Sequence, residues 1–217
     1  MHDHPTSGAT ICRVITKENE RGQEAETMCW PNPDEEPAVM AVILREDTAA
    51  MREGIRWARE SEATLGAGVC MWWTDWSRSN DRRVGAAAVF KHVDRWTFFC
   101  GHLGTGQMEV HDAVRWAIGL ALRESVRRRD TLQTHRVTTV TVFSDSQAGI
   151  RSTEHLEQRP AQALARWINQ SARTLHEAGM EREIHWVPGH TGIPGNEEAD
   201  HQANLAREGR RSGKVRD

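Results

Sequence analysis

The segment VCMWWTD, which runs from Val69 to Asp75, restricts the possible folds of this chain more than any other stretch. Its apolar residues occupy both sets of alternating positions, a pattern typical of a strand whose two faces are both covered. A strand of this kind lies inside a sheet that has helices on both sides. The segment therefore predicts a central strand in an α/β fold, with Asp75 where that strand ends.

The segments after Asp75 predict further strands and helices. Runs rich in β-branched and aromatic residues indicate strands, and apolar residues three and four positions apart indicate helices. The expected strands are 69–75, 84–92, 95–101, 136–145 and 182–187, and the expected helices are 107–128, a short helix from 146, 160–179 and 196–208. The short turn at 93–94 indicates an antiparallel hairpin. The order is three strands, a helix, a strand, two helices, a strand and a final helix.

The first 64 residues differ in composition from the rest of the chain. They hold 13 Asp and Glu against 7 Lys and Arg, a net charge of −6, whereas the remaining residues have a net charge of +3. Segments such as WPNPDEEP show no sustained hydrophobic period, so we expect residues 1–64 to be an acidic, partly disordered leader with one helix near 48–62. We expect residues 66–209 to form the folded domain and residues 210–217 a basic tail.

Composition excludes several classes of protein. Hydrophobic residues make up 38% and charged residues 27% of the chain, as in an ordinary globular protein. No apolar run approaches the roughly 18–20 residues that cross a bilayer, so we expect no membrane contact. The N-terminal segment lacks the pattern of a secretory signal, so we expect an intracellular protein, in the nucleus or cytoplasm and not secreted. The four Cys residues match no zinc-binding spacing, which favours reduced thiols.

Four acidic residues lie where this order of elements brings separate segments together. They are Asp75 and Asp145 at strand ends, Glu109 in the first turn of a helix, and Asp200 early in the last helix. Strand ends in an α/β sheet open onto one edge, where sites commonly form. Carboxylates gathered there repel one another unless cations neutralise them, and oxygen ligands favour a hard ion, Mg²⁺ or Mn²⁺. Two such ions activate a water molecule and stabilise the leaving oxygen of a phosphodiester.

Four short motifs at these positions together resemble those of ribonuclease H. They are TDxS at 74–77, ME at 108–109, SDSQ at 144–147 and WVPGHTGIPGNEEAD at 186–200. The last motif is most similar to the version attached to reverse transcriptases of non-long-terminal-repeat retrotransposons. The resemblance spans roughly residues 68–209. It implies an α/β, ribonuclease H-like fold with flanking helices and a five-stranded mixed sheet, in which three antiparallel strands are followed by two parallel ones.

The resemblance also implies an activity and roles for individual residues. Such enzymes use two Mg²⁺ or Mn²⁺ ions and no small-molecule cofactor to cut the RNA strand of an RNA–DNA hybrid, whose 2′-hydroxyls mark that strand. Asp75 would bridge both metals, Glu109 and Asp145 would complete the shell of one, and Asp200 would bind the other. His190, on a glycine-rich loop, would assist proton transfer or product departure.

Further residues would contact the substrate in this reading. They are Ser77, Ser146, Gln147, Asn196 and Glu197, with Ser146 and Gln147 approaching the minor groove. The segment between Asp145 and Trp186 lacks a helix dense in Lys and Arg, so we expect phosphate contacts from arginines elsewhere, such as Arg78, Arg82 and Arg83, or from the tail. The sequence does not determine the oligomeric state, and a monomer is the default expectation.

One residue departs from the family pattern. Trp76 follows the first Asp, at a position where the family usually has Gly because the RNA backbone passes close. A second hypothesis is therefore a non-catalytic nucleic-acid-binding module with a degenerate site, in which the ring of Trp76 blocks turnover. A third is an integrase or transposase of the same fold class, although that requires a different carboxylate pattern.

Overall fold

A computed structural model describes the backbone of residues 13–18, 24–29 and 40–44, together with residues 56, 68–92, 95–105, 110–153 and 162–209. The strands are β1 (Arg13–Glu18), β2 (Glu24–Cys29), β3 (Met40–Leu44), β4 (Val69–Arg78), β5 (Arg83–His92), β6 (Arg95–Thr105), β7 (Thr139–Ser144) and β8 (Glu181–Trp186). The helices are α2 (Val110–Arg127), α3 (Arg129–Thr134), α4 (Gln147–Ser152), α5 (Gln162–Glu177) and α6 (Pro194–Arg207).

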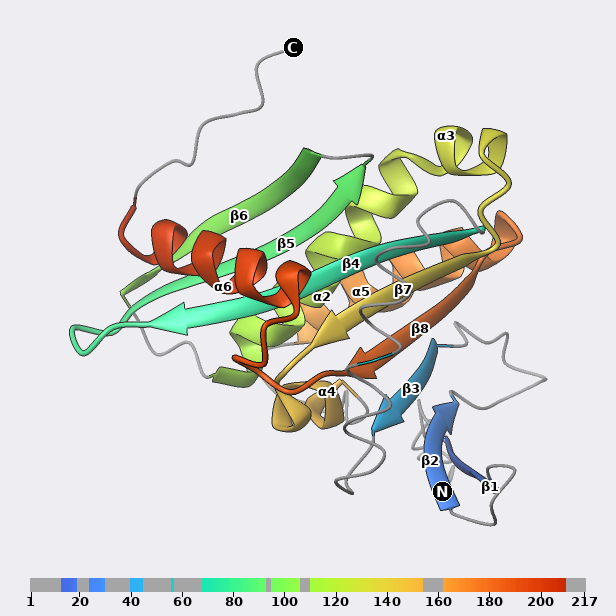
Figure 1. Cartoon of the computed structure of the whole chain (residues 1–217), viewed down its shortest axis with the longest axis horizontal. Coiled ribbons are helices and arrows are strands. Elements are labelled where there is room, and N and C mark those ends of the chain that lie inside the picture. The colour runs from blue at the N-terminus through green and yellow to red at the C-terminus, as the bar shows by residue number, and fades with distance from the viewer. Residues whose placement is uncertain are drawn as a thin grey trace, which may run out of the picture.

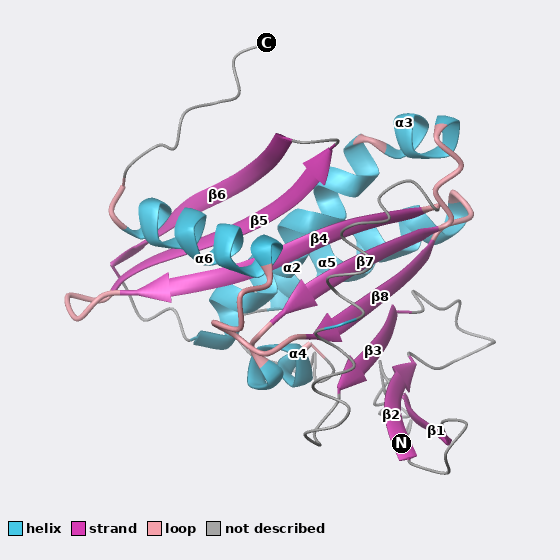
Figure 2. Ribbon diagram, viewed as in Figure 1, coloured by secondary structure: helices cyan, strands magenta, loops and turns pink. Residues whose placement is uncertain are grey.

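All of these strands belong to one sheet, in the order β1-β2-β3-β8-β7-β4-β5-β6. Figures 1 and 2 show the sheet crossing the molecule with helices on both of its faces. The five strands β8, β7, β4, β5 and β6, neighbours in that order, confirm the expected mixed sheet. Neighbours among β4, β5 and β6 are antiparallel, and β7 and β8 run parallel to β4. The strand predicted from VCMWWTD is β4, which lies between β5 and β7.

The expected leader contributes strands to the sheet. Three strands come from it, and β3 pairs in parallel with β8 through partners such as Val42 and Ile184. Without β3, β8 would be an edge strand with a row of unpaired backbone groups, and the short apolar run MAVIL satisfies them. The predicted helix near 48–62 lies outside the described residues except at Arg56, which is helical, and the tail at 210–217 also lies outside them.

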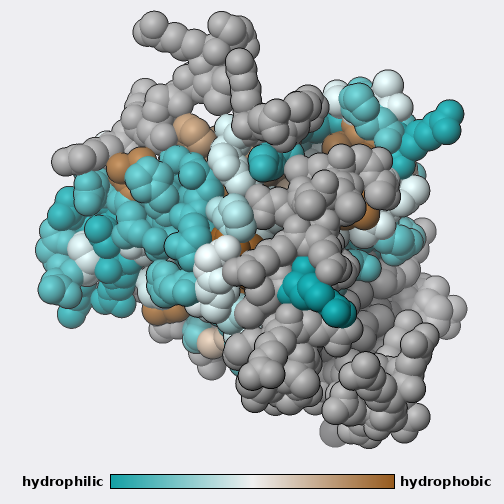
Figure 3. Space-filling model, viewed as in Figure 1, coloured by the Kyte–Doolittle hydropathy of each residue, from teal (hydrophilic) through white to brown (hydrophobic). Residues whose placement is uncertain are grey.

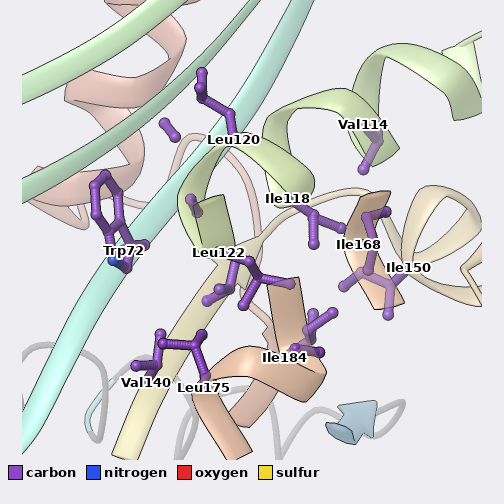
Figure 4. Packing of buried hydrophobic residues seen from close by; sticks show 14 of the residues in the cluster. Trp72, Val114, Ile118, Leu120, Leu122, Val140, Ile150, Ile168, Leu175 and Ile184 are labelled. Carbon is purple, nitrogen blue, oxygen red and sulfur yellow. The ribbon is translucent and has the colours of Figure 1, made fainter. Parts of the chain in front are cut away.

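Alternation along β4 directs its side chains into two separate cores. Trp72 belongs to a cluster with residues of α2, α4 and α5, including Ile118, Ile150 and Ile168, and Figure 4 shows this packing. Trp73, on the opposite face, packs with Phe143, and the two rings stack with centroids 5.5 Å apart. The helices α2, α4 and α5 therefore cover one face of the sheet, and α6 covers the other (Figure 1).

The outer surface over α6 and the turn between β4 and β5 is mainly hydrophilic (Figure 3). In that turn the amide of Arg82 donates to the carbonyl of Ser79 at 2.9 Å, and Asp81 pairs with Arg83 at 2.8 Å. In the part of the chain that the structure describes, no helix combines the length and the apolar character needed to cross a lipid bilayer.

Candidate active site

Asp75 and Asp145 lie side by side at one end of the sheet. The register pairs Thr74 of β4 with Ser144 of β7, so each Asp follows one member of this pair. The Thr74 hydroxyl donates to the carbonyl of Phe143 at 2.8 Å and ties the two strands together at this point. The indole N–H of Trp186 donates to the carbonyl of Asp145 at 2.9 Å and holds the backbone after β7. Two of the predicted carboxylates therefore come from adjacent parallel strands.

Asp200 reaches the same site because α6 packs unusually close to the sheet. A Cβ at Gly195 would lie 2.2 Å from the ring of Trp73, and a Cβ at Gly85 of β5 would lie 2.3 Å from the carbonyl oxygen of Ala203. Real Cβ atoms do not approach other atoms so closely, so only glycine fits at these two positions. The helix α6 therefore contacts the sheet closely at its first turn and again near its end, and Asp200 lies between these two contacts.

The electrostatics show that these carboxylates share one site. Burial, together with the negative charges of Asp145, Asp200 and Glu197, raises the pKa of Asp75 to about 8. The backbone N–H of Trp76, which donates to Asp75 at 2.7 Å, acts in the opposite direction. The side chain of Asp75 is only 7% exposed. Burial also raises the pKa of Asp145, opposed by a hydrogen bond from Asn196 and by the charge of His190. Without a cation, the site disfavours its own ionised form.

We expect Asp75→Asn to stabilise the metal-free protein at alkaline pH. Because the pKa of Asp75 rises from 3.8 to about 8 on folding, its ionisation costs folding free energy that grows as the pH increases between these values. At roughly pH 9, in chelator, the variant should melt about 5 °C above the parent, and the difference should vanish near pH 4. Melting curves across this range test the prediction, and an unchanged difference at all pH values would contradict it.

The loop between β8 and α6 packs against Asp145. A Cβ at Gly189 would lie 2.6 Å from a carboxylate oxygen of Asp145, so the loop backbone passes directly over this group. His190 is exposed and has a φ of 54°, a left-handed conformation. The amide of Gly192 donates to the Glu197 carboxylate at 3.3 Å, which holds the loop against the first turn of α6. The loop therefore places an exposed imidazole beside the half-buried carboxylate of Asp145.

The other predicted residues take the following places. Asn196 is buried, at 1% exposure, and its side chain hydrogen-bonds Asp145. Ser146 caps α4 by accepting from the amide of Gly149 at 3.1 Å, and the half-buried Gln147 is the first residue of that helix. Ser77 lies two residues beyond Asp75 on the same strand face, where its hydroxyl hydrogen-bonds residues of α6. Glu109 lies outside the described residues.

Sequence reasoning missed Asn204, which lies one helical turn after Asp200. Its side-chain amide donates to the Asp200 carboxylate at 2.9 Å. A polar residue four positions after a predicted ligand, on the same helix face, is the signal that points to it.

The donor set suits a hard divalent cation. Within the described residues, no three His, Cys, Asp or Glu side chains form a group that would hold a metal ion by themselves, and the expected fourth carboxylate, Glu109, lies outside those residues. Asp75, Asp145 and Asp200 offer only oxygen atoms and interact electrostatically with one another. Mutually repelling carboxylates of this kind are relieved by Mg²⁺ or Mn²⁺, which prefer oxygen ligands.

Similarity to known proteins covers the part of the chain that carries this site. Among solved structures, the chain is similar to RNase H1 from the archaeon Halobacterium salinarum, at 19% identity, with 65% of this chain and 99% of that one covered and a TM-score of 0.46. It is also similar to the N-terminal RNase H domain of Rv2228c from Mycobacterium tuberculosis, at 16% identity, with 64% and 98% covered and a TM-score of 0.47. No curated protein matches the chain. The RNase H family matches residues 68–208, which carry all of the residues described above, and the chain therefore belongs to the RNase H family.

Proposed function

We propose that this protein is a metal-dependent endonuclease that hydrolyses the RNA strand of RNA–DNA hybrids. The observation that carries the proposal is the meeting of Asp75, Asp145 and Asp200, from three distant segments, in one partly buried site. Acidic groups with a raised pKa are costly to folding, and such groups concentrate where function requires them. Membership of the RNase H family supports the substrate class.

In this proposal two divalent ions, Mg²⁺ or Mn²⁺, are held by Asp75, Asp145, Asp200 and Glu109. When bound, the ions would supply an activated water molecule and neutralise charge on the leaving oxygen. The protein's own groups keep the ligands in place: Asn196 orients Asp145 by a hydrogen bond, and the N–H of Trp76 orients Asp75. These contacts fix the carboxylates before any ion or substrate arrives.

His190 is the group best placed to move a proton. It is exposed and lies beside Asp145, and histidine is the side chain that most often acts as a general acid or base in enzymes. The loop that carries it is held by the contact between Gly192 and Glu197. Opening of this contact would let product depart, which is a role that the glycines at 189 and 192 permit.

The substrate surface that we propose surrounds this site. Ser146 and Gln147 lie at the start of α4, directly after Asp145, where they face a minor groove that displays 2′-hydroxyls. Arg78, the last residue of β4, and Arg82, in the β4–β5 turn, are both exposed, and they lie beyond the last residue that β4 pairs with β7. We assign them to the phosphate backbone, where their charge adds affinity that falls with salt.

The position of Trp76 argues against the alternative of a degenerate binding module, in which its ring would block turnover. Side chains on a strand alternate between faces, so Trp76 lies on the face opposite to Asp75. Its half-buried ring packs against the Trp72 cluster. The ring is therefore engaged with the core beneath α2, and we favour the active enzyme.

We expect Trp76→Gly to destabilise the protein without increasing cleavage. The substitution removes an aromatic ring from a partly buried position and places glycine in a strand, at a cost of about 2–4 kcal/mol. Chemical denaturation measures the loss, and the rate of hybrid cleavage at a temperature where both proteins are folded gives the comparison. A rate well above that of the parent would show that the ring obstructs the substrate.

The proposed function is tested by incubating the protein with an RNA–DNA hybrid labelled on each strand in turn, with Mg²⁺ or with Mn²⁺. We expect internal cleavage of the RNA strand only, and none in chelator. Matched DNA and RNA duplexes of the same sequence are the controls. Binding of the hybrid without cleavage in either metal would favour the degenerate binding module.

We further propose that the domain descends from a retrotransposon of the non-long-terminal-repeat class. The support is the sequence of the loop and helix from Trp186 to Asp200, which is most similar to the version of the motif in those elements.

A further inference from the structure

We infer that Asn204 and Ser77 position the carboxylate of Asp200 and set the affinity of this part of the site for a divalent cation. The inference rests on the proposed function only in taking Asp200 as a metal ligand. It starts from a continuous series of hydrogen bonds, here called the relay, that runs from Asp200 through Asn204 and Ser77 to Arg207. The relay joins α6 to β4.

The first link holds the Asp200 side chain against its own helix. The side-chain nitrogen of Asn204 donates to the Asp200 carboxylate at 2.9 Å and to the Asp200 backbone carbonyl, also at 2.9 Å. Both hydrogens of the amide are thus used on one residue. Two simultaneous contacts restrict the rotation of Asp200 more than a single one, because the side chain and the backbone are fixed to the same group.

The second link fixes the orientation of the Asn204 amide. The Ser77 hydroxyl donates to the side-chain oxygen of Asn204 at 2.7 Å, and it accepts from the guanidinium of Arg207 at 2.9 Å. If the amide were turned over, its oxygen would face the two oxygens of Asp200, and its nitrogen would lose them as acceptors. The hydroxyl of Ser77, which is itself oriented by Arg207, therefore selects the orientation in which Asn204 donates to Asp200.

The third feature is the strand to which the chain is anchored. Ser77 lies two residues after Asp75, so both side chains are on the same face of β4. Ser77 is paired with Gly85, the residue whose missing Cβ lets the backbone of α6 approach the sheet. The relay consequently fixes Asp200 relative to the strand that carries Asp75, and not merely within α6.

The choice of a neutral amide matters for cation binding. A Lys or Arg at position 204 would form an ion pair with Asp200 and compete with a metal for its charge. Asn204 orients the carboxylate by hydrogen bonds while leaving its negative charge intact. When residues that orient metal ligands in this manner are removed, metal affinity commonly falls by about 10- to 100-fold.

The test is a titration of the full chain with Mn²⁺ alone, in which isothermal titration calorimetry measures the affinity for the ion. We expect Asn204→Ala to weaken Mn²⁺ binding by roughly tenfold or more, and Ser77→Ala to weaken it less. Asn204→Lys should weaken it further than Asn204→Ala, because it adds a competing charge. Ser77→Thr keeps the hydroxyl and should restore affinity toward that of the parent. The double variant of Asn204→Ala with Ser77→Ala should lose no more Mn²⁺ affinity than Asn204→Ala alone, because both residues act through the same relay.

Two further measurements separate positioning from loss of structure. Melting temperatures in chelator report whether each variant remains folded, and the Ser77→Ala and Ser77→Thr pair keeps the test decisive if Asn204→Ala does not fold. In hybrid cleavage, the Asn204→Ala variant should require more Mn²⁺ for half-maximal rate while its KM for hybrid stays unchanged. Mn²⁺ affinity equal to that of the parent in the folded Ser77→Ala or Asn204→Ala variant would overturn the inference, and so would a parent that binds no Mn²⁺. A parent that binds Mn²⁺ with this dependence but cleaves no hybrid would overturn the proposed function and leave the relay standing.

Discussion

Asp145→Asn should abolish hybrid cleavage while leaving hybrid binding intact. The asparagine has nearly the same shape but lacks the charge that a cation requires, so we expect the rate to fall roughly 10³-fold or more, which corresponds to about 4 kcal/mol of transition-state stabilisation. Cleavage of a labelled hybrid at saturating Mg²⁺ measures the rate, and fluorescence anisotropy with the same hybrid measures the affinity.

Asp130→Asn is the matched control for this experiment. Asp130 is 91% exposed on α3, which precedes β7, whereas Asp145 follows the other end of that strand. Its substitution therefore removes the same charge at the opposite end of the sheet (Figure 1). We expect its cleavage rate to equal that of the parent. A comparable loss in both variants would mean that overall charge, rather than the position of Asp145, governs the activity.

The largest effect on stability is expected from Gly85→Ala. The added Cβ would lie 2.3 Å from both the carbonyl oxygen of Ala203 and the amide nitrogen of Arg207, and these are backbone atoms that cannot rotate away. The helix α6 must therefore shift or the strand must bend, at a cost that we place above about 3 kcal/mol. Urea denaturation measures this loss.

The same substitution should reduce activity in the fraction that remains folded. Asp200 and Asn204 both belong to α6, and a displacement of about 1 Å is enough to lower a rate by roughly 100-fold. Gly104→Ala is the control, because a Cβ there meets nothing within 4 Å and adds only the strain of a positive φ, roughly 1–2 kcal/mol. A smaller loss for Gly85→Ala than for this control would show that α6 does not pack on β5 in this manner.

Local patterns were sufficient for the central part of the fold. Burial on both faces of β4 follows directly from VCMWWTD, and the hairpin and the crossover helix follow from turn residues and apolar spacing. The leader is different, since its strands are short and β3 pairs with β8, more than 130 positions later, as the pairing of Met40 with Arg182 shows. The first 45 residues show no sustained hydrophobic period, so the sequence alone indicated a loose or partly extended leader and not the strand with which it pairs.

The candidate site divides in a similar manner. Asp75, Asp145 and Asp200 were predicted from strand ends and a helix start, and the structure brings them together. The relay through Asn204 and Ser77 was not predicted, because these residues are 127 positions apart. Their contact exists only because Gly85 allows α6 to approach the sheet.

The sequence by itself thus determined which residues form strands and helices and which acidic side chains end up at one edge of the sheet. Both depend on spacings of two, three and four residues, which are visible within a short window. Only the tertiary structure decided that the ring of Trp76 packs against the core, how closely α6 approaches β5, and which side chains orient Asp200. These features depend on the distance between separate elements, and that distance is set by the side chains packed between them.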